Sequence, residues 1–83
     1  MKEKIILITG CSTGIGFDAV FALKKRGHRV IGSCRKQEDV QKLLDMGVEA
    51  VQLDVSDSAS IQRAFTEVMA KTEGRLDVLI NNA

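Results

Sequence analysis

Short apolar runs recur along the chain, separated by longer stretches of mixed polarity. Residues 4–9 (KIILIT) are apolar on both faces of an extended chain, as expected of a buried parallel strand. Residues 28–34, 48–54 and 77–80 are further short segments with the β-branched side chains typical of strands. The pattern therefore predicts four strands.

Between these runs, apolar residues recur at the spacing typical of an α-helix. Residues 15–26 predict a first helix that ends in basic residues just before a glycine, and residues 37–46 predict a second. A third helix, with Asp57 or Ser58 as its N-cap, is expected to continue to about Glu73, because apolar residues recur there at i, i+3, i+4 and i+7. The chain thus alternates strands with helices.

This alternation predicts the fold class: α/β, a Rossmann-type doubly wound parallel sheet of βαβαβαβ connectivity. The expected strand order is 3-2-1-4 in three layers, within a single domain over residues 1–83. The first two helices would cover one face and the third the other, which leaves the fourth strand as an apolar edge. We therefore expect an incomplete sheet, the amino-terminal part of a longer protein.

A glycine-rich segment follows the first predicted strand and opens the first helix. Gly10, Gly14 and Gly16 are spaced Gly-x-x-x-Gly-x-Gly, unlike the G-x-G-x-x-G fingerprint, and the Gly-Lys-Ser/Thr of a P-loop is missing. Such glycines permit a tight turn and let a pyrophosphate approach the helix N–H groups, with Ser12 and Thr13 as further donors. The segment predicts a dinucleotide-phosphate site; the alternative is an ordinary strand-to-helix turn.

Two more motifs stand at the ends of later strands. Asp54 ends the third, and Asn81-Asn82-Ala83 follows the fourth. Together with Thr9-Gly-x-x-x-Gly14-Ile15-Gly16, in this order, they resemble the short-chain dehydrogenase/reductase family. The resemblance spans the whole chain and the amino-terminal portion of that family's fold.

The resemblance implies a role in binding NAD(P) for each motif. The glycine loop would wrap the phosphates and the adenosine ribose, through Gly10, Cys11, Ser12, Thr13, Gly14, Ile15 and Gly16. Asp54 would accept a hydrogen bond from the adenine amino group, with the Val55 backbone beside it. Asn81, Asn82 and Ala83 would lie against the nicotinamide-side ribose and brace the sheet. The family's catalytic Ser, Tyr and Lys stand later in its chains, and this sequence has no Tyr, so no catalytic residue is assigned.

The end of the second strand bears on the choice of cofactor. An acid there accepts hydrogen bonds from the ribose 2′-OH, whereas an arginine accommodates a 2′-phosphate. Arg35 stands at this place, with Ser33 and Lys36 as possible assistants and no acid before Glu38. We therefore expect NADP(H) to be preferred over NAD(H); the alternative is a solvated basic pair.

These features indicate an NADP(H)-dependent oxidoreductase that interconverts an alcohol and a carbonyl on a small molecule. The resemblance implies a homo-oligomer in the full-length form, and the 83-residue chain alone is expected to be inactive. One alternative is a non-catalytic dinucleotide-binding module or sensor. Another is a phospho-acceptor domain using Asp54, although such domains need paired acids where Gly10 and Cys11 stand.

Composition excludes several other functions. A formal net charge of +1 gives no sign of the basic surface that is typical of nucleic-acid-binding proteins. Two cysteines without Cys-x-x-Cys spacing and a single histidine argue against a metal site and favour a reducing compartment. Apolar runs such as residues 5–8 are too short to span a membrane, and we do not expect a secretory signal peptide. The expected location is the cytoplasm.

Overall fold

The four strands form one parallel sheet in the order β3-β2-β1-β4. The computed structural model describes residues 2–82. Its strands are β1 (Ile5–Ile8), β2 (Arg29–Cys34), β3 (Glu49–Gln52) and β4 (Val78–Ile80). β1 is central, and its Ile8 is in register with Gly32 of β2 and Ile80 of β4. The predicted strand order 3-2-1-4 is confirmed.

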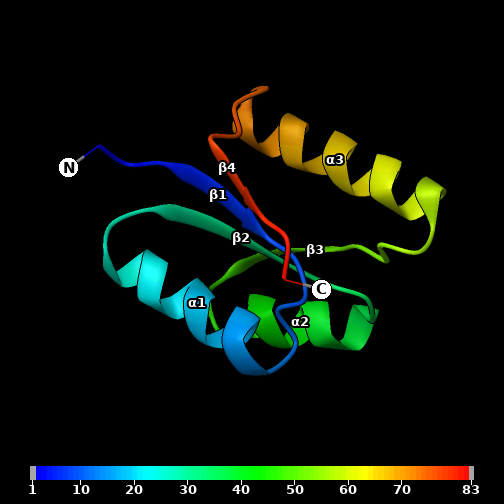
Figure 1. The fold of residues 1–83 in the computed structure, drawn as a ribbon, viewed down its shortest axis with the longest axis horizontal. Coiled ribbons are helices and arrows are strands. Elements are labelled where there is room, and N and C mark those ends of the chain that lie inside the picture. The colour runs from blue at the N-terminus through cyan, green and yellow to red at the C-terminus, as the bar shows by residue number, and fades with distance from the viewer. Residues whose placement is uncertain (1, 83) are drawn as a thin grey trace.

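Three helices cover the two faces of this sheet. They are α1 (Gly14–Lys25), α2 (Gln37–Asp45) and α3 (Ser58–Thr72). Figure 1 shows α1 and α2 on one face and α3 on the other, so the predicted three-layer Rossmann-type arrangement is confirmed. Within residues 2–82, none of the helices has the length and apolar character needed to cross a membrane.

Alternate side chains of β1 enter two separate cores. Ile6 and Ile8 pack with Val20 of α1 on one face, whereas Leu7 packs with Val68 of α3 on the other. All four residues of β1 are buried. Each buried aliphatic side chain of this size contributes about 1.5–3 kcal/mol, which is why the central strand carries an uninterrupted apolar run.

The ends of the elements differ from the predicted ranges by at most two residues. Hydrogen bonds explain several of these differences. Val48 is buried, but its N–H donates to the Leu43 carbonyl (3.0 Å) and so belongs to the turn after α2. α3 begins after Asp57, whose carboxylate accepts the Ala59 N–H (3.0 Å), in agreement with the predicted cap. It ends at Thr72, and the C-cap residue Glu73 takes a left-handed conformation (φ 57°).

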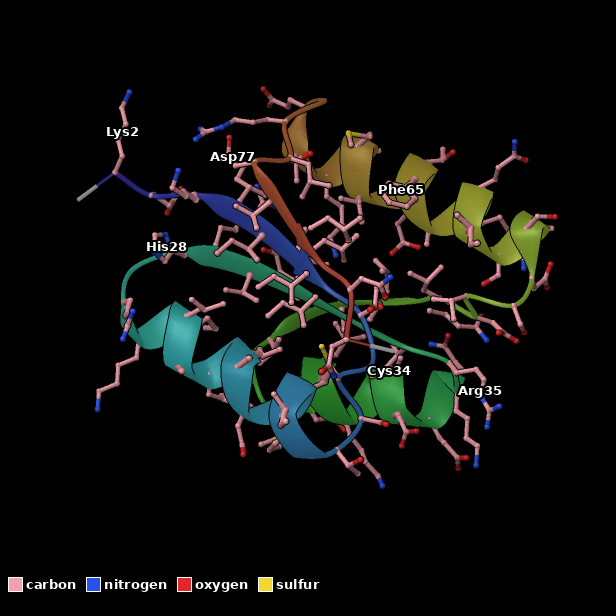
Figure 2. All side chains as sticks on the ribbon, in the orientation of Figure 1. Lys2, His28, Cys34, Arg35, Phe65 and Asp77 are labelled. Atoms are coloured by element: carbon pink, nitrogen blue, oxygen red, sulfur yellow. The ribbon has the colours of Figure 1, made fainter. Side chains whose placement is uncertain are left out.

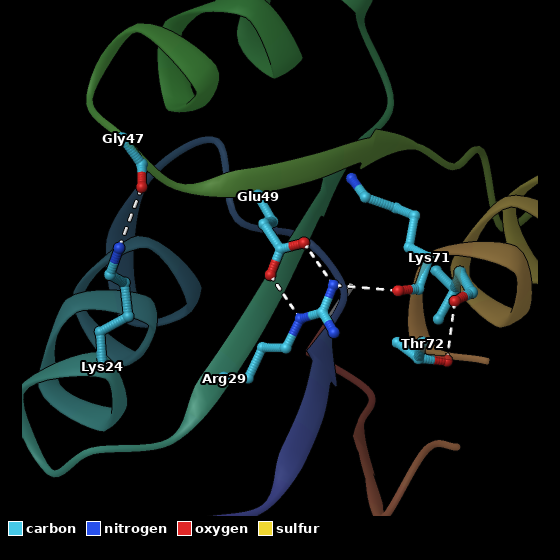
Figure 3. Close-up of polar contacts among 7 residues, drawn as sticks. Lys24, Arg29, Gly47, Glu49, Lys71 and Thr72 are labelled. Carbon is cyan, nitrogen blue, oxygen red and sulfur yellow. Dashed lines mark hydrogen bonds and ion pairs between the residues drawn. The ribbon is translucent and has the colours of Figure 1, made fainter. Parts of the chain in front are cut away.

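Polar contacts tie the layers together at the amino-terminal edge of the sheet (Figure 3). Arg29 of β2 donates two hydrogen bonds to the Glu49 carboxylate of β3, both 2.8 Å, and a third to the Lys71 carbonyl at 3.1 Å. The Arg29 guanidinium thereby lowers the pKa of Glu49. Lys24 of α1 donates to the Gly47 carbonyl at 2.9 Å. This cluster lies at the opposite end of the strands from the glycine loop.

Candidate functional site

The glycine loop turns the chain sharply between β1 and α1. Gly10 and Gly14 have φ values of 67° and 66°, a region that residues with a Cβ rarely adopt. Between them, the Cys11 N–H donates to the Ser33 carbonyl (2.9 Å) and joins the loop to β2. The turn therefore depends on glycine at two positions and is held against the neighbouring strand.

The loop leads directly into α1, whose amino end has no side-chain cap. Thr13, which precedes the helix, makes no side-chain capping bond, and the first turn has no acidic residue. The first N–H groups of a helix lack partners within it and carry partial positive charge. Ser12 and Thr13 are exposed beside them, and Ile15 is 81% exposed. The donor set is open to solvent, has no competing carboxylate, and fits a phosphate group.

Gly16 lets α1 approach the loop more closely than any other residue could. A Cβ at this position would overlap the Gly10 carbonyl oxygen and stand 2.5 Å from Nδ2 of Asn82. The Asn82 amide instead donates to the Gly10 carbonyl at 3.2 Å. The third glycine of the motif is therefore a packing requirement, which sets the position of the helix end.

The two asparagines after β4 brace this loop. Thr9, at the end of β1, is buried; its hydroxyl donates to the Asn81 side-chain oxygen (3.2 Å) and accepts the Asn82 N–H (2.9 Å). The Thr9 N–H donates to the Ile80 carbonyl (3.0 Å). The expected bracing role thus has a structural basis at both asparagines, whereas Ala83 lies outside the described residues.

Asp54 lies beyond the end of β3 with its carboxylate held by the next turn. Its Oδ1 accepts both the N–H (3.0 Å) and the hydroxyl (2.6 Å) of Ser56. These bonds lower the pKa of Asp54, and the charge of Arg35 lowers it further. Val55 is 51% exposed beside it. The carboxylate is therefore ionised near neutral pH and accessible from the carboxyl edge of the sheet.

Arg35 and its two possible assistants in binding a 2′-phosphate, Ser33 and Lys36, differ in position. Arg35 is exposed where β2 ends and extends away from the sheet, whereas Cys34 points inward (Figure 2). Ser33 was expected to assist Arg35, and this is wrong. Ser33 lies within β2, which helices cover on both faces, and its side chain is 0% exposed. Lys36 is exposed next to Arg35 and can still assist it.

The two thiols belong to the core. Cys11 and Cys34 are both buried and free, in the cluster formed between the sheet, α1 and α2. Burial raises the pKa of Cys11, and it raises the pKa of Cys34 to about 11. The Cys11 thiol donates to the Ile8 carbonyl (3.0 Å). Its side chain therefore faces away from any ligand of the loop, which leaves its backbone as the part that can contact one.

Two serines that hold Asp54 were missed in the sequence. Ser56 binds its carboxylate, and the buried Ser60 hydroxyl accepts the Asp54 N–H at 2.9 Å. The Asp-x-Ser spacing was the available signal, because an aspartate often accepts the N–H of the second residue after it. The bond to Ser60, six positions along the chain, has no comparable local signature.

The carboxyl edge of the sheet thus gathers three predicted segments: the glycine loop, Asp54 with its turn, and Asn81-Asn82. Arg35 stands at the same edge. Donors at the start of α1 and the cation of Arg35 suit phosphate oxygens, whereas the Asp54 carboxylate suits a ring that carries N–H groups. The arrangement matches an elongated ligand with several phosphates and a nucleobase.

Comparison with known proteins agrees with this geometry. The family model for short chain dehydrogenases matches residues 4–83. The chain is 42% identical over 83 residues to an uncharacterized oxidoreductase, YbbO, of Escherichia coli strain K12, covering 100% of the chain and 31% of that protein. It is 41% identical to an NADPH-dependent 1-acyldihydroxyacetone phosphate reductase of Schizosaccharomyces pombe, covering 98% and 28%.

Solved structures give the same result. The chain superposes on a crystal structure of an actinorhodin polyketide ketoreductase variant with NADPH at a TM-score of 0.83 and 33% identity, covering 98% of the chain and 33% of that protein. The chain therefore spans about a third of the length of each of these three proteins. Sequence, fold and site agree, and the chain belongs to the short-chain dehydrogenase family.

Proposed function

We propose that this chain forms the cofactor-binding part of an NADP(H)-dependent oxidoreductase that interconverts a small-molecule alcohol and a carbonyl. The observation that carries the proposal is the uncapped start of α1, held against Asn82 by the close approach at Gly16. Two similar proteins are named for NADPH, one as a reductase and one as a ketoreductase. Both thiols are free, which supports a reducing, cytoplasmic compartment.

The residues of this chain bind and orient the cofactor. The first N–H groups of α1, with the hydroxyls of Ser12 and Thr13, bind the pyrophosphate. Asp54 accepts a hydrogen bond from the adenine amino group, and the Val55 N–H is placed to donate to the ring. The Asn81-Asn82 segment limits how far the nicotinamide-side ribose can shift. When bound, the cofactor supplies the two-electron redox chemistry.

Arg35 carries the proposed preference for NADP(H). Its guanidinium is exposed at the end of β2, and the nearby Asp54 carboxylate is already bound by Ser56. Arginine matches the geometry of a phosphate and keeps its charge at every physiological pH. No acid stands between Arg35 and Glu38 to accept the 2′-OH of NAD(H).

The test is the affinity of the intact protein for the two reduced cofactors, measured by fluorescence titration. Arg35→Ala should weaken NADPH binding about 10- to 100-fold, because hydrogen bonds to charged groups contribute about 1.5–3 kcal/mol, and should leave NADH binding nearly unchanged. Arg63→Ala removes an exposed arginine of α3 and is the matched control. Equal losses for both cofactors would overturn the NADP(H) assignment, and no binding of either would overturn the proposed function.

A further inference from the structure

The turn after β3 holds Asp54 by its side chain and by its backbone. Ser56 donates its N–H and its hydroxyl to one carboxylate oxygen, Oδ1, at 3.0 and 2.6 Å. The Asp54 N–H donates to the Ser60 hydroxyl at 2.9 Å, and its carbonyl accepts the Asp57 N–H at 3.0 Å. Both torsions of the aspartate side chain are therefore restrained, although the residue is only half-buried.

These contacts leave a defined pair of hydrogen-bonding groups facing outward. Among residues 2–82, no group donates to the second carboxylate oxygen of Asp54, and none accepts the N–H of Val55. An acceptor and a donor on successive residues match the edge of adenine, whose amino group donates and whose neighbouring ring nitrogen accepts. Hypoxanthine has the opposite order, with a carbonyl and a ring N–H on the same edge.

Ser56 is not needed to begin the following helix. Asp57 caps α3 by accepting the Ala59 N–H, and the Asp57 N–H is already bound by the Asp54 carbonyl. The side chain of Ser56 contacts Asp54 alone among the hydrogen bonds of residues 2–82, and it is exposed. Its hydroxyl therefore acts on the orientation of the carboxylate and not on the entry to α3.

We propose that Ser56 is a positioning residue that fixes the Asp54 carboxylate to accept from the amino group of adenine, and so sets discrimination between adenine and hypoxanthine dinucleotides. This inference rests on the proposed binding of a nicotinamide dinucleotide. Ser56 does not touch the ligand itself. Its hydroxyl occupies Oδ1 and leaves the other oxygen directed at the base.

The experiment compares the dissociation constants of NADPH and of its hypoxanthine analogue, deamino-NADPH, by fluorescence titration of the intact protein. The variants are Ser56→Ala, which removes the hydroxyl, and Ser56→Thr, which keeps it. Ser58→Ala is the matched control, because Ser58 is exposed at the first position of α3, two residues after Ser56, and its side chain makes no hydrogen bond within residues 2–82. Thermal unfolding of each variant reports on folding separately.

The unaltered protein should bind NADPH about tenfold or more tightly than deamino-NADPH, as expected for a hydrogen bond to a charged acceptor. Ser56→Ala should reduce this ratio by at least about threefold through weaker NADPH binding, whereas Ser56→Thr and Ser58→Ala should retain it. An unchanged ratio in Ser56→Ala would overturn the inference while leaving the proposed function intact. If the unaltered protein bound neither NADPH nor NADH, the proposed function and the inference would both be overturned.

Discussion

Replacing Gly16 by alanine tests whether α1 must approach the glycine loop so closely. The added Cβ would overlap the Gly10 carbonyl oxygen and would lie 2.5 Å from Nδ2 of Asn82 and 3.1 Å from the Gly10 carbonyl carbon. Heavy atoms in unstrained contact lie about 3.5–4.0 Å apart. The Asn82 amide must therefore withdraw by about 1 Å, and the Gly10 backbone must shift as well.

The size of the effect follows from these two displacements. Overpacking against fixed neighbours destabilises a protein by about 1–3 kcal/mol. Loss of the 3.2 Å hydrogen bond from Asn82 to Gly10 adds about 0.5–1.5 kcal/mol. Gly16→Ala should thus lower the free energy of unfolding by about 1.5–4.5 kcal/mol. It should also weaken NADPH binding about tenfold or more, because the helix N–H groups that face the phosphates are displaced.

Urea unfolding and NADPH fluorescence titration of the intact protein measure the two effects separately. Ala22→Gly is the stability control, because Ala22 is an exposed residue of the same helix and glycine there costs about 1 kcal/mol of helix propensity. That variant should unfold more easily and still bind NADPH normally. The reasoning is refuted if Gly16→Ala unfolds within about 0.5 kcal/mol of the unaltered protein and binds NADPH equally well.

Two further predictions concern the amino-terminal edge and the thiols. Arg29→Met should lower the free energy of unfolding by about 0.5–1 kcal/mol, because its pair with Glu49 is partly exposed. Arg29 lowers the pKa of Glu49, so this stabilisation is present above the unfolded pKa of about 4.3 and is lost as the pH falls through the folded value. Urea unfolding measured across acidic pH should therefore show a weaker pH dependence of stability in the variant. Identical pH profiles for the variant and the unaltered protein would contradict the assignment. Cys11 and Cys34 should resist iodoacetamide near neutral pH in the folded protein and react once it is unfolded, since burial raises both pKa values. Mass spectrometry that detects alkylation of the native protein would contradict their placement in the core.

The strand order could be predicted from the sequence because hydrophobic patterning reports burial directly. A run that is apolar on both faces, as in residues 4–9, suits a central parallel strand covered by helices on both sides, and β1 has that place. The ends of the elements depend on hydrogen bonds instead. Val48 fits a strand by its side chain, but its N–H closes the turn after α2.

The candidate site could be predicted only at positions where the local structure admits a single residue type. The loop glycines occupy such positions, because residues with a Cβ rarely adopt a positive φ and do not fit where a Cβ would overlap its neighbours. Ser33 does not occupy such a position, because a serine hydroxyl near the end of a strand can either bind a ligand or lie buried in the protein interior. Its Oγ is buried and has no hydrogen-bond partner among residues 2–82, which composition and spacing did not indicate.

The bracing of the loop by β4 links the phosphate site to the least buried strand of the sheet. Asn82 bonds to Thr9 and Gly10, which precede it by more than 70 positions. In the same strand, Leu79 is 50% and Ile80 is 36% exposed within this chain. Under the proposed function, a dinucleotide that binds only the braced loop would also stabilise the contacts of Asn82 with Thr9 and Gly10.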